Sequence, residues 1–589
     1  MLLCLASTTA LALRARGSPR APPPRACAPS GGHLFVAQGD LRRVLADAVL
    51  YPTTDAMDAE WFPDGAPGEM FERSFTLERR VQRLDNIPDG EPSVWLSWVR
   101  YQDPEPRPPA WFVGAVEQFL RDAFEWSCAD GRRPLCGRQL PLLALPVVGT
   151  GESGAKPIAG DMIAALISLL RAFVATRAVD VLLVTKSRQM LSAAQATRRR
   201  YDRLPDGALR PWAALPPSLE AAAHRLAALA RGGRLALFLG SGVSRAAALP
   251  GWTELLSECA RAAGVGSAAE RAQLAKLSVT EQATLLQVRL GKRRLAAERE
   301  AHGGGGGGGG GDASPERVAE LGRQELQRLA AARLSCERYA VLHALLASLP
   351  HAAVVTTNSD LCYDAACAAA GVSLNVLPYD TRPSERWLLK LHGDVHHPED
   401  IVLTYSSGAP YGADREALSG LVQALLITKH MLFVGFSLRD TSFNQVATTV
   451  RRALGAADDA EEEPSAAPQA FGSAITLSER PFLAELWPDL ESIPVSAGVA
   501  ADEADRAMRR RITEVLLDRV CLIASPGAEH VLAPTLAGTR TAADNELREE
   551  LESLAEALRD EPACRDAAAF EVVESMLIEL GYPPERLRP

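Results

Sequence analysis

Four short apolar runs between residues 234 and 440 each stop abruptly at small or polar residues. Each run is rich in Leu or β-branched residues, and this near-continuous apolar character predicts a strand buried on both faces of a parallel sheet. In open parallel sheets, ligands bind just beyond the carboxyl ends of the strands. We therefore expect the polar ends of the four runs to meet in one crevice. The runs read RLALFLGSGVS, AAVVTTNSD, WLLKLHGD and HMLFVGFSLRD.

The first run ends in a glycine-rich loop, residues 240–244, between a predicted strand and a predicted helix. Its glycines permit positive φ and a close approach of the backbone to a diphosphate. The third glycine of the usual dinucleotide fingerprint is absent, because Arg245 and Ala246 follow. Such a loop alone is weak evidence for nucleotide binding. The evidence becomes stronger when the three runs that follow are considered with it.

The four motifs occur in a fixed order: Gly-x-Gly-Val-Ser from Gly240, Thr-x-Asn-x-Asp from Thr356, Leu-His-Gly from Leu391 and Gly-x-Ser-Leu from Gly435. This ordered set resembles the SIR2-like family, which has the sirtuin-type NAD-binding fold. The resemblance is closer to a divergent branch of NAD-consuming defence proteins, in which an apolar-Pro-x-Trp segment follows the first motif, as residues 249–252 do here. The Pro-Asp-Phe-Arg type sequence of the deacylases is absent.

The resemblance implies roles for individual residues. Asn358 would hold a ribose hydroxyl or orient a water, and His392 would act as a general base, because imidazole titrates near neutral pH. Asp360 would fix its loop or contact the nicotinamide carboxamide, and an Asx turn that caps the strand is the alternative. The remaining nucleotide contacts are expected at Gly240, Ser241, Gly242, Val243, Ser244, Thr357, Gly393, Gly435, Ser437, Leu438 and Asp440.

The reaction that this resemblance implies is hydrolysis of NAD to nicotinamide and ADP-ribose, with NAD as the substrate. An NAD-dependent protein deacylase or ADP-ribosyl transferase would cleave the same bond, so it stays open as an alternative. A non-catalytic sensor of NAD or ADP-ribose is the third hypothesis, and the presence of both Asn358 and His392 argues against it.

Charge and cysteine spacing exclude two classes of partner. The formal net charge of -10 offers no general attraction to nucleic acid. None of the ten cysteines forms a Cys-x-x-Cys pair, so no zinc site of the sirtuin type and no metal ligands are expected. The scattered cysteines favour a reducing compartment, and we expect an intracellular protein of the cytoplasm or an organelle. The sequence leaves homo-oligomerisation open.

Residues 33–200 predict an N-terminal α/β domain. Strands are expected near its start, at PLLALP and at VDVLLVT, with a helix between the last two. The region resembles a macro domain through Gly39-Asp40, the strand from Asp47, and the loop Gly149-x-Gly151-x-x-Gly154, which implies an ADP-ribose-type ligand. A structural α/β domain with a tight glycine turn is the alternative.

The rest of the chain is divided by composition. Residues 1–32 lack acids and are rich in Arg, Ser and Pro, which indicates either a targeting peptide or a leader without structure. We expect a linker helix at 201–233, the SIR2-like domain at 234–498 and a helical C-terminal region at 499–589. Nine consecutive glycines, 303–311, predict a flexible tether in a helical insertion, and 456–469 an acidic surface loop. No segment after the leader is expected to span a membrane.

Overall fold

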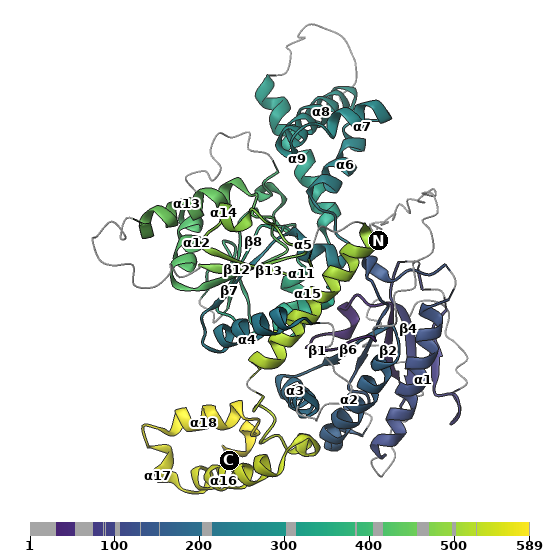
Figure 1. Cartoon of the computed structure of the whole chain (residues 1–589), viewed down its shortest axis with the longest axis vertical. Helices are drawn as coiled ribbons and strands as arrows, with labels where there is room; N and C mark the ends of the chain where they lie inside the picture. The colour runs from purple at the N-terminus through teal and green to yellow at the C-terminus, as the bar shows by residue number, and fades with distance from the viewer. Residues whose placement is uncertain are drawn as a thin grey trace, which may run out of the picture.

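The computed structural model describes most of the chain, in the ranges 31–53, 75–85, 87–88, 90–99, 107–129, 131–151, 154–202, 212, 215–301, 314–382, 386–403, 416–455, 471–497, 502–525 and 527–587. Within them the chain is α/β, as predicted, with two sheets of mainly parallel strands and many helices (Figure 1). Nearly all of the leader, the run of nine glycines and the acidic stretch 456–469 lie outside the described residues.

The N-terminal sheet has six strands in the order β1-β6-β5-β2-β4-β3, and only β3 is antiparallel to its neighbour. The strands at 34–38, 48–53, 142–146 and 180–185 fall where the sequence predicts them, whereas β3 and β4 were not predicted. Its strands are β1 (Leu34–Gln38), β2 (Ala48–Thr53), β3 (Val81–Arg83), β4 (Ser93–Trp98), β5 (Leu142–Pro146) and β6 (Asp180–Thr185).

The second sheet has seven strands, all parallel, in the order β13-β12-β11-β7-β8-β10-β9. All four runs that open the sequence argument form strands of this sheet. The strands are β7 (Leu235–Leu239), β8 (Ala353–Thr356), β9 (Asn375–Leu377), β10 (Trp387–Lys390), β11 (His430–Val434), β12 (Gly472–Thr476) and β13 (Leu490–Pro494).

Both sheets are buried on both faces, which explains their continuous apolar runs. The outer face of the N-terminal sheet packs on α1 (Pro109–Ser127) and α2 (Ala159–Ala175), with α3 (Arg188–Asp202) at its edge. The outer face of the second sheet packs on α12 (Glu416–Thr428) and α13 (Thr441–Gly455).

The two inner faces share one hydrophobic cluster, filled by a layer of helices between the sheets. Figure 1 shows α15 crossing the molecule between the N-terminal and the second sheet. The region predicted as a linker therefore contributes to the core, because the buried side of α4 packs into this layer. The layer consists of α4 (Pro217–Arg231), α10 (Val341–Ser348), α11 (Cys362–Ala369) and α15 (Glu503–Ala524).

Two helical groups stand outside the sheets. The insertion after β7 has its own apolar core and is formed by α6 (Trp252–Ala262), α7 (Ala268–Leu274), α8 (Val279–Ala301) and α9 (Pro315–Leu334). The C-terminal group, drawn in yellow in Figure 1, packs around a smaller cluster. Its helices are α16 (Ala542–Asp560), α17 (Pro562–Arg565) and α18 (Phe570–Glu579).

One described helix, Lys156–Ala175, is long and apolar enough to cross a membrane by length and composition alone. The expectation that no segment after the leader spans a membrane is not contradicted by one helix that passes this test. Half of the helix is buried inside the protein, and α2, which forms most of it, packs against the N-terminal sheet. The core helix of a globular domain meets the same criterion, so the test is weak evidence for a membrane.

Candidate functional site

The polar ends of four neighbouring strands meet at one edge of the second sheet. The strands that precede the motifs are β11, β7, β8 and β10, which are adjacent in that order and parallel. Their carboxyl ends therefore point to the same edge, as the sequence argument requires. The structure brings the predicted residues together from segments that are up to 200 residues apart, counted from Gly240 to Asp440 (440 − 240).

The glycines of two of these loops are required by the contact between the loops. The Gly242 amide donates to the Gly435 carbonyl at 2.9 Å, and Gly435 has φ +64. A Cβ on Gly240 would lie 2.6 Å from the Gly435 oxygen, and one on Gly242 would lie 2.7 Å from its Cα. Both neighbours are backbone atoms, so neither glycine can be replaced without separating the loops. The glycines at 240 and 242 are therefore explained in part by the close packing of these two loops against each other.

A hydrogen-bonded trio joins the loop after β7 to the loop after β8. Ser244 Oγ donates to Asp360 Oδ2 at 2.5 Å, and the Asn358 amide nitrogen donates to Ser244 Oγ at 2.9 Å and to the Gly240 carbonyl at 3.0 Å. Asp360 also accepts from the Cys362 amide at 3.0 Å. Ser244 and Asp360 are buried, whereas Asn358 is half-buried. The trio fixes the orientation of the Asn358 side chain.

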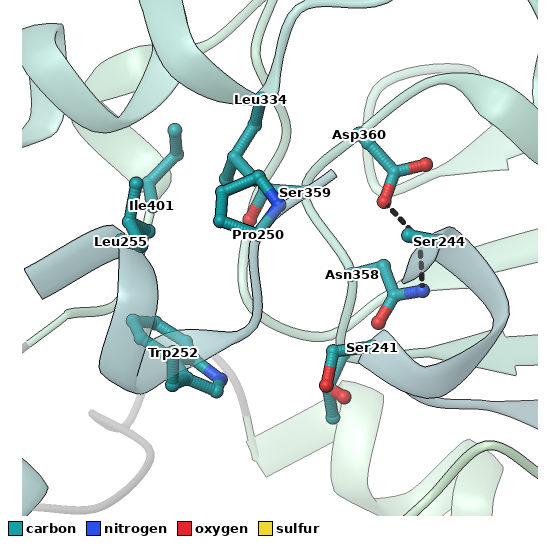
Figure 2. Close-up of a pocket in the computed structure, with 11 residues that line it drawn as sticks. Ser241, Ser244, Pro250, Trp252, Leu255, Leu334, Asn358, Ser359, Asp360 and Ile401 are labelled. Carbon is teal, nitrogen blue, oxygen red and sulfur yellow. Dashed lines mark hydrogen bonds between the residues drawn. The ribbon is translucent and has the colours of Figure 1, made fainter. Parts of the chain in front are cut away.

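Asn358 lines a small cavity between these loops and the helical insertion. Figure 2 shows its amide nitrogen directed to Ser244 and its carbonyl oxygen on the side of Ser241. One wall is polar and comes from the loop ends, and the facing wall is apolar and comes largely from α6 and the end of α9. The polar wall consists of Ser241, Ser244, Thr357, Asn358, Ser359 and Asp360, and the apolar wall of Pro250, Trp252, Leu255, Leu334 and Ile401.

The predicted base lies beside this cavity rather than in its lining. His392 is buried, and its Nε2 lies 3.7 Å from Asp440 Oδ2. Asp440 also caps α13, since its Oδ1 accepts from the Phe443 amide at 2.9 Å. Gly393 has φ +75 and contacts the backbone of Asp400. The loops after β8 and β10 are joined, because the Val395 amide donates to the Ser359 carbonyl at 2.9 Å.

The other predicted contacts divide into buried and exposed positions. Val243 and Leu438 are buried, and the backbone of Leu438 has φ +59. Ser437 is exposed at the end of β11, where its Oγ accepts from the Arg439 amide at 3.3 Å. Val243 therefore belongs to the apolar core under the loop, whereas Ser437 is open to solvent and its contact with a nucleotide stays a prediction.

A buried lysine that was not predicted from the sequence supports the Asp360 loop. Lys390 is fully buried, donates to the Asp360 carbonyl at 2.7 Å and forms ion pairs with Asp364 at 3.1 Å and Asp394 at 3.9 Å. Burial raises the pKa of Asp364 although the ammonium opposes it. The signal available in the sequence was a lysine inside an apolar run, since a charged residue is buried only when it is paired.

Three side chains could hold a metal ion next to the trio. The ligand atoms of His343, Asp360 and Cys362 lie within 4.8 Å of one another, and all three residues are buried. Burial lowers the pKa of His343 to about 4, so its imidazole is neutral. The spacing of the cysteines predicts no metal ligands, and this cluster differs because it joins one cysteine to a histidine and an aspartate from distant parts of the chain.

The N-terminal residues predicted to bind a nucleotide have internal contacts. The Asp40 carboxylate accepts from the Arg42 backbone amide at 3.0 Å and pairs with its guanidinium at 2.7 Å. Gly149 has φ +82, and a Cβ there would lie 2.7 Å from the Phe112 ring. Asp40 lines a cleft that faces the second sheet, whereas residues 149–154 are not in its described lining. The macro-like ligand site stays a prediction.

Comparison with known proteins adds the family of the second sheet. Residues 352–481 match the SIR2-like domain, so the chain contains a SIR2-like domain. The match covers β8 to β12. The first motif and β7 lie before it in the chain, but β7 pairs with β8 and β11 in the middle of the same sheet.

Two curated relatives are similar to part of this chain. Defense-associated sirtuin 2 of Bacillus subtilis is 29% identical over 118 residues, which are 19% of this chain and 12% of the relative. NAD(+) hydrolase ThsA of Bacillus cereus (strain MSX-D12) is 32% identical over 117 residues, which are 19% of this chain and 25% of the relative. The chain thus spans a quarter or less of these relatives.

Proposed function

We propose that the SIR2-like domain hydrolyses NAD to nicotinamide and ADP-ribose. The observation that carries the proposal is the cavity at the ends of β7 and β8, where the Asn358 amide nitrogen is bound by Ser244 and Gly240 and its carbonyl oxygen lies on the side of Ser241 (Figure 2). A wall of hydroxyl and amide groups suits ribose, and the facing wall with Trp252 suits a flat pyridine ring. The name of the relative ThsA, an NAD(+) hydrolase, supports the same substrate.

The proposed reaction breaks the bond between C1′ of the ribose and the nicotinamide nitrogen. The electron pair of that bond leaves with nicotinamide, and the ribose passes through an oxocarbenium-like transition state, as in other glycosyl transfers. Asn358 would hold a ribose hydroxyl or the attacking water through its carbonyl oxygen. A neutral amide is suited to this role because it orients the water without competing as a nucleophile.

His392 would accept the proton that the attacking water or the ribose hydroxyl loses. The Asp440 carboxylate lies 3.7 Å from its Nε2 and would stabilise the imidazolium that forms. Its position outside the cavity lining requires that the water approach from the side of the β10 loop. The proposal needs no metal, since Asp360 already accepts bonds from Ser244 and Cys362, and we expect activity to survive treatment with a chelator.

Two other functions use the same site. A deacylase or an ADP-ribosyl transferase would pass ADP-ribose to an acyl oxygen or to a protein side chain instead of water. A non-catalytic sensor would bind NAD without breaking it. The absence of the deacylase segment from the sequence and the name of ThsA favour hydrolysis.

The test is to incubate the purified chain with NAD and to separate the products by chromatography, with and without an acylated lysine peptide. Hydrolysis gives equal amounts of nicotinamide and ADP-ribose, and the peptide changes neither. Acyl-ADP-ribose formed only with peptide would assign a deacylase. If NAD binds and is recovered intact, the result would support the non-catalytic sensor.

A further inference from the structure

Lys390 lies where two loops of the candidate site leave the second sheet. It is the last residue of β10 and pairs in register with Thr356, the last residue of β8. Asn358 follows Thr356 by two residues, and His392 follows Lys390 by two residues. The two proposed functional side chains therefore leave the sheet on adjacent strands. The Lys390 side chain is fully buried at the base of both loops.

The Lys390 ammonium contacts three separate segments of the chain. It donates to the Asp360 carbonyl at 2.7 Å, and it lies 3.1 Å from Asp364 Oδ2 and 3.9 Å from Asp394 Oδ2. These partners belong to the loop after β8, to α11 and to the loop after β10. An ammonium has three N–H groups, so one lysine can hold all three segments at the same time.

The bond to the Asp360 carbonyl acts on Asn358 through two further hydrogen bonds. The Asp360 carboxylate accepts from Ser244 Oγ at 2.5 Å, and Ser244 Oγ accepts from the Asn358 amide nitrogen at 2.9 Å. A shift of the Asp360 backbone would move its carboxylate and, through Ser244, would turn the Asn358 amide. Lys390 therefore contributes to the orientation of the Asn358 carbonyl oxygen without contacting that residue.

The contact with Asp394 acts in the same way on the loop of His392. While Asp394 Oδ2 faces Lys390, its Oδ1 accepts from two backbone amides of the turn after His392, at 2.8 and 3.2 Å. The Val395 amide in this turn donates to the Ser359 carbonyl at 2.9 Å. The lysine thus holds the second loop in place and supports its contact with the first.

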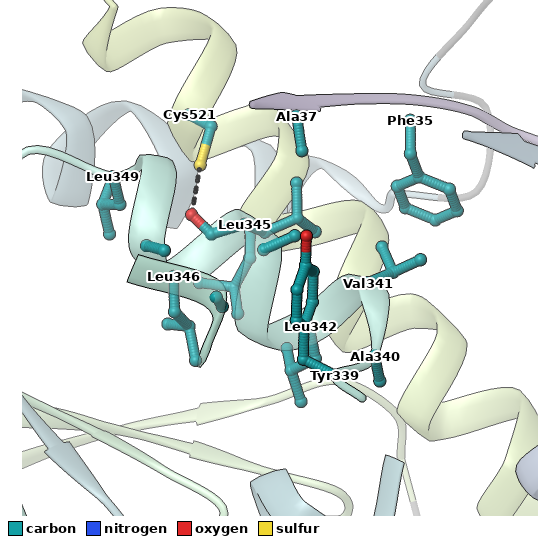
Figure 3. Close-up of a cluster of buried hydrophobic side chains, with 14 of the residues drawn as sticks. Phe35, Ala37, Tyr339, Ala340, Val341, Leu342, Leu345, Leu346, Leu349 and Cys521 are labelled. Atoms are coloured by element: carbon teal, nitrogen blue, oxygen red, sulfur yellow. Dashed lines mark hydrogen bonds between the residues drawn. The ribbon is translucent and has the colours of Figure 1, made fainter. Parts of the chain in front are cut away.

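The third partner of the ammonium connects both loops to the helical layer between the sheets. Asp364 lies in the first turn of α11, and four residues of this helix are buried in the cluster that the two sheets share. Figure 3 shows part of this cluster, with Leu342, Leu345 and Leu346 of α10. A functional side chain is held precisely when its supporting groups are fixed on packed elements.

We propose that Lys390 is a positioning residue of the NAD-cleaving site, because its ammonium fixes the loops of Asn358 and His392 to α11. The inference rests on the proposed function. Lys390 is not in the described lining of the cavity, so it acts through Asp360 and Asp394. The alternative is that the ammonium only balances the charge of the neighbouring carboxylates, which would make it a residue of the fold.

The first test measures steady-state NAD turnover by variants of the full chain. Lys390→Met keeps an unbranched side chain of similar length and removes the ammonium. We expect kcat to fall about a hundredfold and KM for NAD to change by less than about threefold, because a displaced positioning group slows turnover more than it weakens substrate binding. Lys429→Met is the matched control and should leave both constants unchanged. It also removes a bond from a lysine to a backbone carbonyl, that of Gly233 at 2.8 Å.

A double variant separates positioning from charge balance. Lys390→Met combined with Asp364→Asn removes one charge of each sign, so it leaves less unpaired charge in the interior than Lys390→Met alone. The bond to the Asp360 carbonyl is still missing, and kcat should therefore stay low. This variant also serves as the test protein if Lys390→Met alone does not fold.

Hydrogen exchange followed by mass spectrometry gives a second measurement that does not depend on NAD. Peptides that contain residues 357–361 and 392–397 should exchange faster in both Lys390 variants than in the wild-type chain, because both loops lose a bond to α11. Peptides from β7 should exchange at the wild-type rate. In Lys429→Met, exchange in the two loops should not change.

Four outcomes would overturn the proposal. A near-normal kcat in the double variant would show that charge balance is the whole role of Lys390. A rise in KM at constant kcat would assign Lys390 to substrate binding, and unchanged exchange in the two loops would show that it does not hold them. If neither Lys390 variant folds, the lysine belongs to the fold. If the wild-type chain does not turn over NAD, the proposed function fails, and hydrogen exchange still decides whether Lys390 holds the two loops.

Discussion

The two sheets have the same layered architecture, but their polar residues are used differently. In the SIR2-like sheet, the residues after the strands include Ser241 and Asn358, which line a cavity. In the N-terminal sheet, Asp47 accepts the amides of Leu135 and Leu142, and Asp180 is bound by two arginines. Polar side chains thus line a candidate site in one sheet and stabilise the fold in the other. Function belongs to the site and not to the architecture.

Buried ion pairs that stabilise the fold lie where α15 meets the N-terminal sheet. Asp518 is fully buried and accepts from Arg198 at 2.6 and 3.0 Å and contacts His33 at 2.7 Å. Asp180 is bound in the same way by Arg511 and Arg138. Helix α15 therefore completes the N-terminal region through buried ion pairs between distant parts of the chain.

The largest effect that tests this comparison is expected from Asp518→Ala. It leaves the Arg198 guanidinium buried without its carboxylate, which costs about 3–5 kcal/mol. Urea unfolding measures this loss, and NAD turnover per folded molecule should not change. Asp85→Ala, which removes an exposed partner of Arg83, is the control and should leave the unfolding midpoint unchanged. If the two variants have equal midpoints, the ion pairs do not hold the region together.

The same carboxylate gives a pH dependence of stability. Burial alone raises the pKa of Asp518, but Arg198 and His33 outweigh it and hold the pKa below its ordinary value of 3.8. At acid pH the unfolded chain therefore binds this proton more readily than the folded chain. The stabilisation is fully present above pH 3.8 and is lost as the pH falls through the lower folded value. Asp518→Ala should flatten the acid limb of a plot of unfolding free energy against pH.

On the site-directed side, we expect Asn358→Ala and His392→Ala each to lower NAD turnover by about a hundredfold or more, or roughly 2.7 kcal/mol in the barrier. Stability should change less than in the Asp518 variant. Matched controls are Asn375→Ala, whose buried amide lies on β9, and His396→Ala, an exposed histidine beyond the motif. Near-normal turnover in both test variants would exclude this cavity as the site.

The two glycine loops offer a third contrast. In Gly242→Ala, the new methyl would lie 2.7 Å from the Gly435 Cα and 2.8 Å from its oxygen, and separating the loops should cost about 1–3 kcal/mol. Gly151→Ala in the N-terminal loop meets nothing within 4 Å and should be tolerated. Thermal unfolding of the two variants measures the difference. A Gly242 variant as stable as the wild type would show that this glycine has no packing role. The close approach of a ligand to the backbone would then be the remaining explanation for the glycine.

The parts of this molecule that could be predicted were those encoded locally. Apolar runs that end at Gly240, Thr357, His392 and Gly435 define strands, and parallel order places their ends on one edge. The apolar wall of the cavity could not be found in this way, because Trp252 and Leu334 are brought together by the fold of the helical insertion. The helical layer between the sheets also depends on non-local packing, which leaves no periodic signal in the sequence.

The smallest expected effect concerns Asp40, and it decides whether the N-terminal region also has a ligand. Its half-buried pair with Arg42 is worth little, so Asp40→Ala should hardly change stability. The resemblance to macro domains predicts that the full chain binds a second ADP-ribose and that this variant weakens the binding in calorimetry. The full chain is needed, because a fragment ending near residue 200 would expose the sheet face that α10 and α15 cover. ADP-ribose is the product of the proposed reaction, so this titration has no contribution from turnover. If ADP-ribose binds equally well with and without the Asp40 carboxylate, Asp40 serves only to bind Arg42. The polar residues of the N-terminal sheet would then stabilise the fold, and those of the second sheet would line the candidate site.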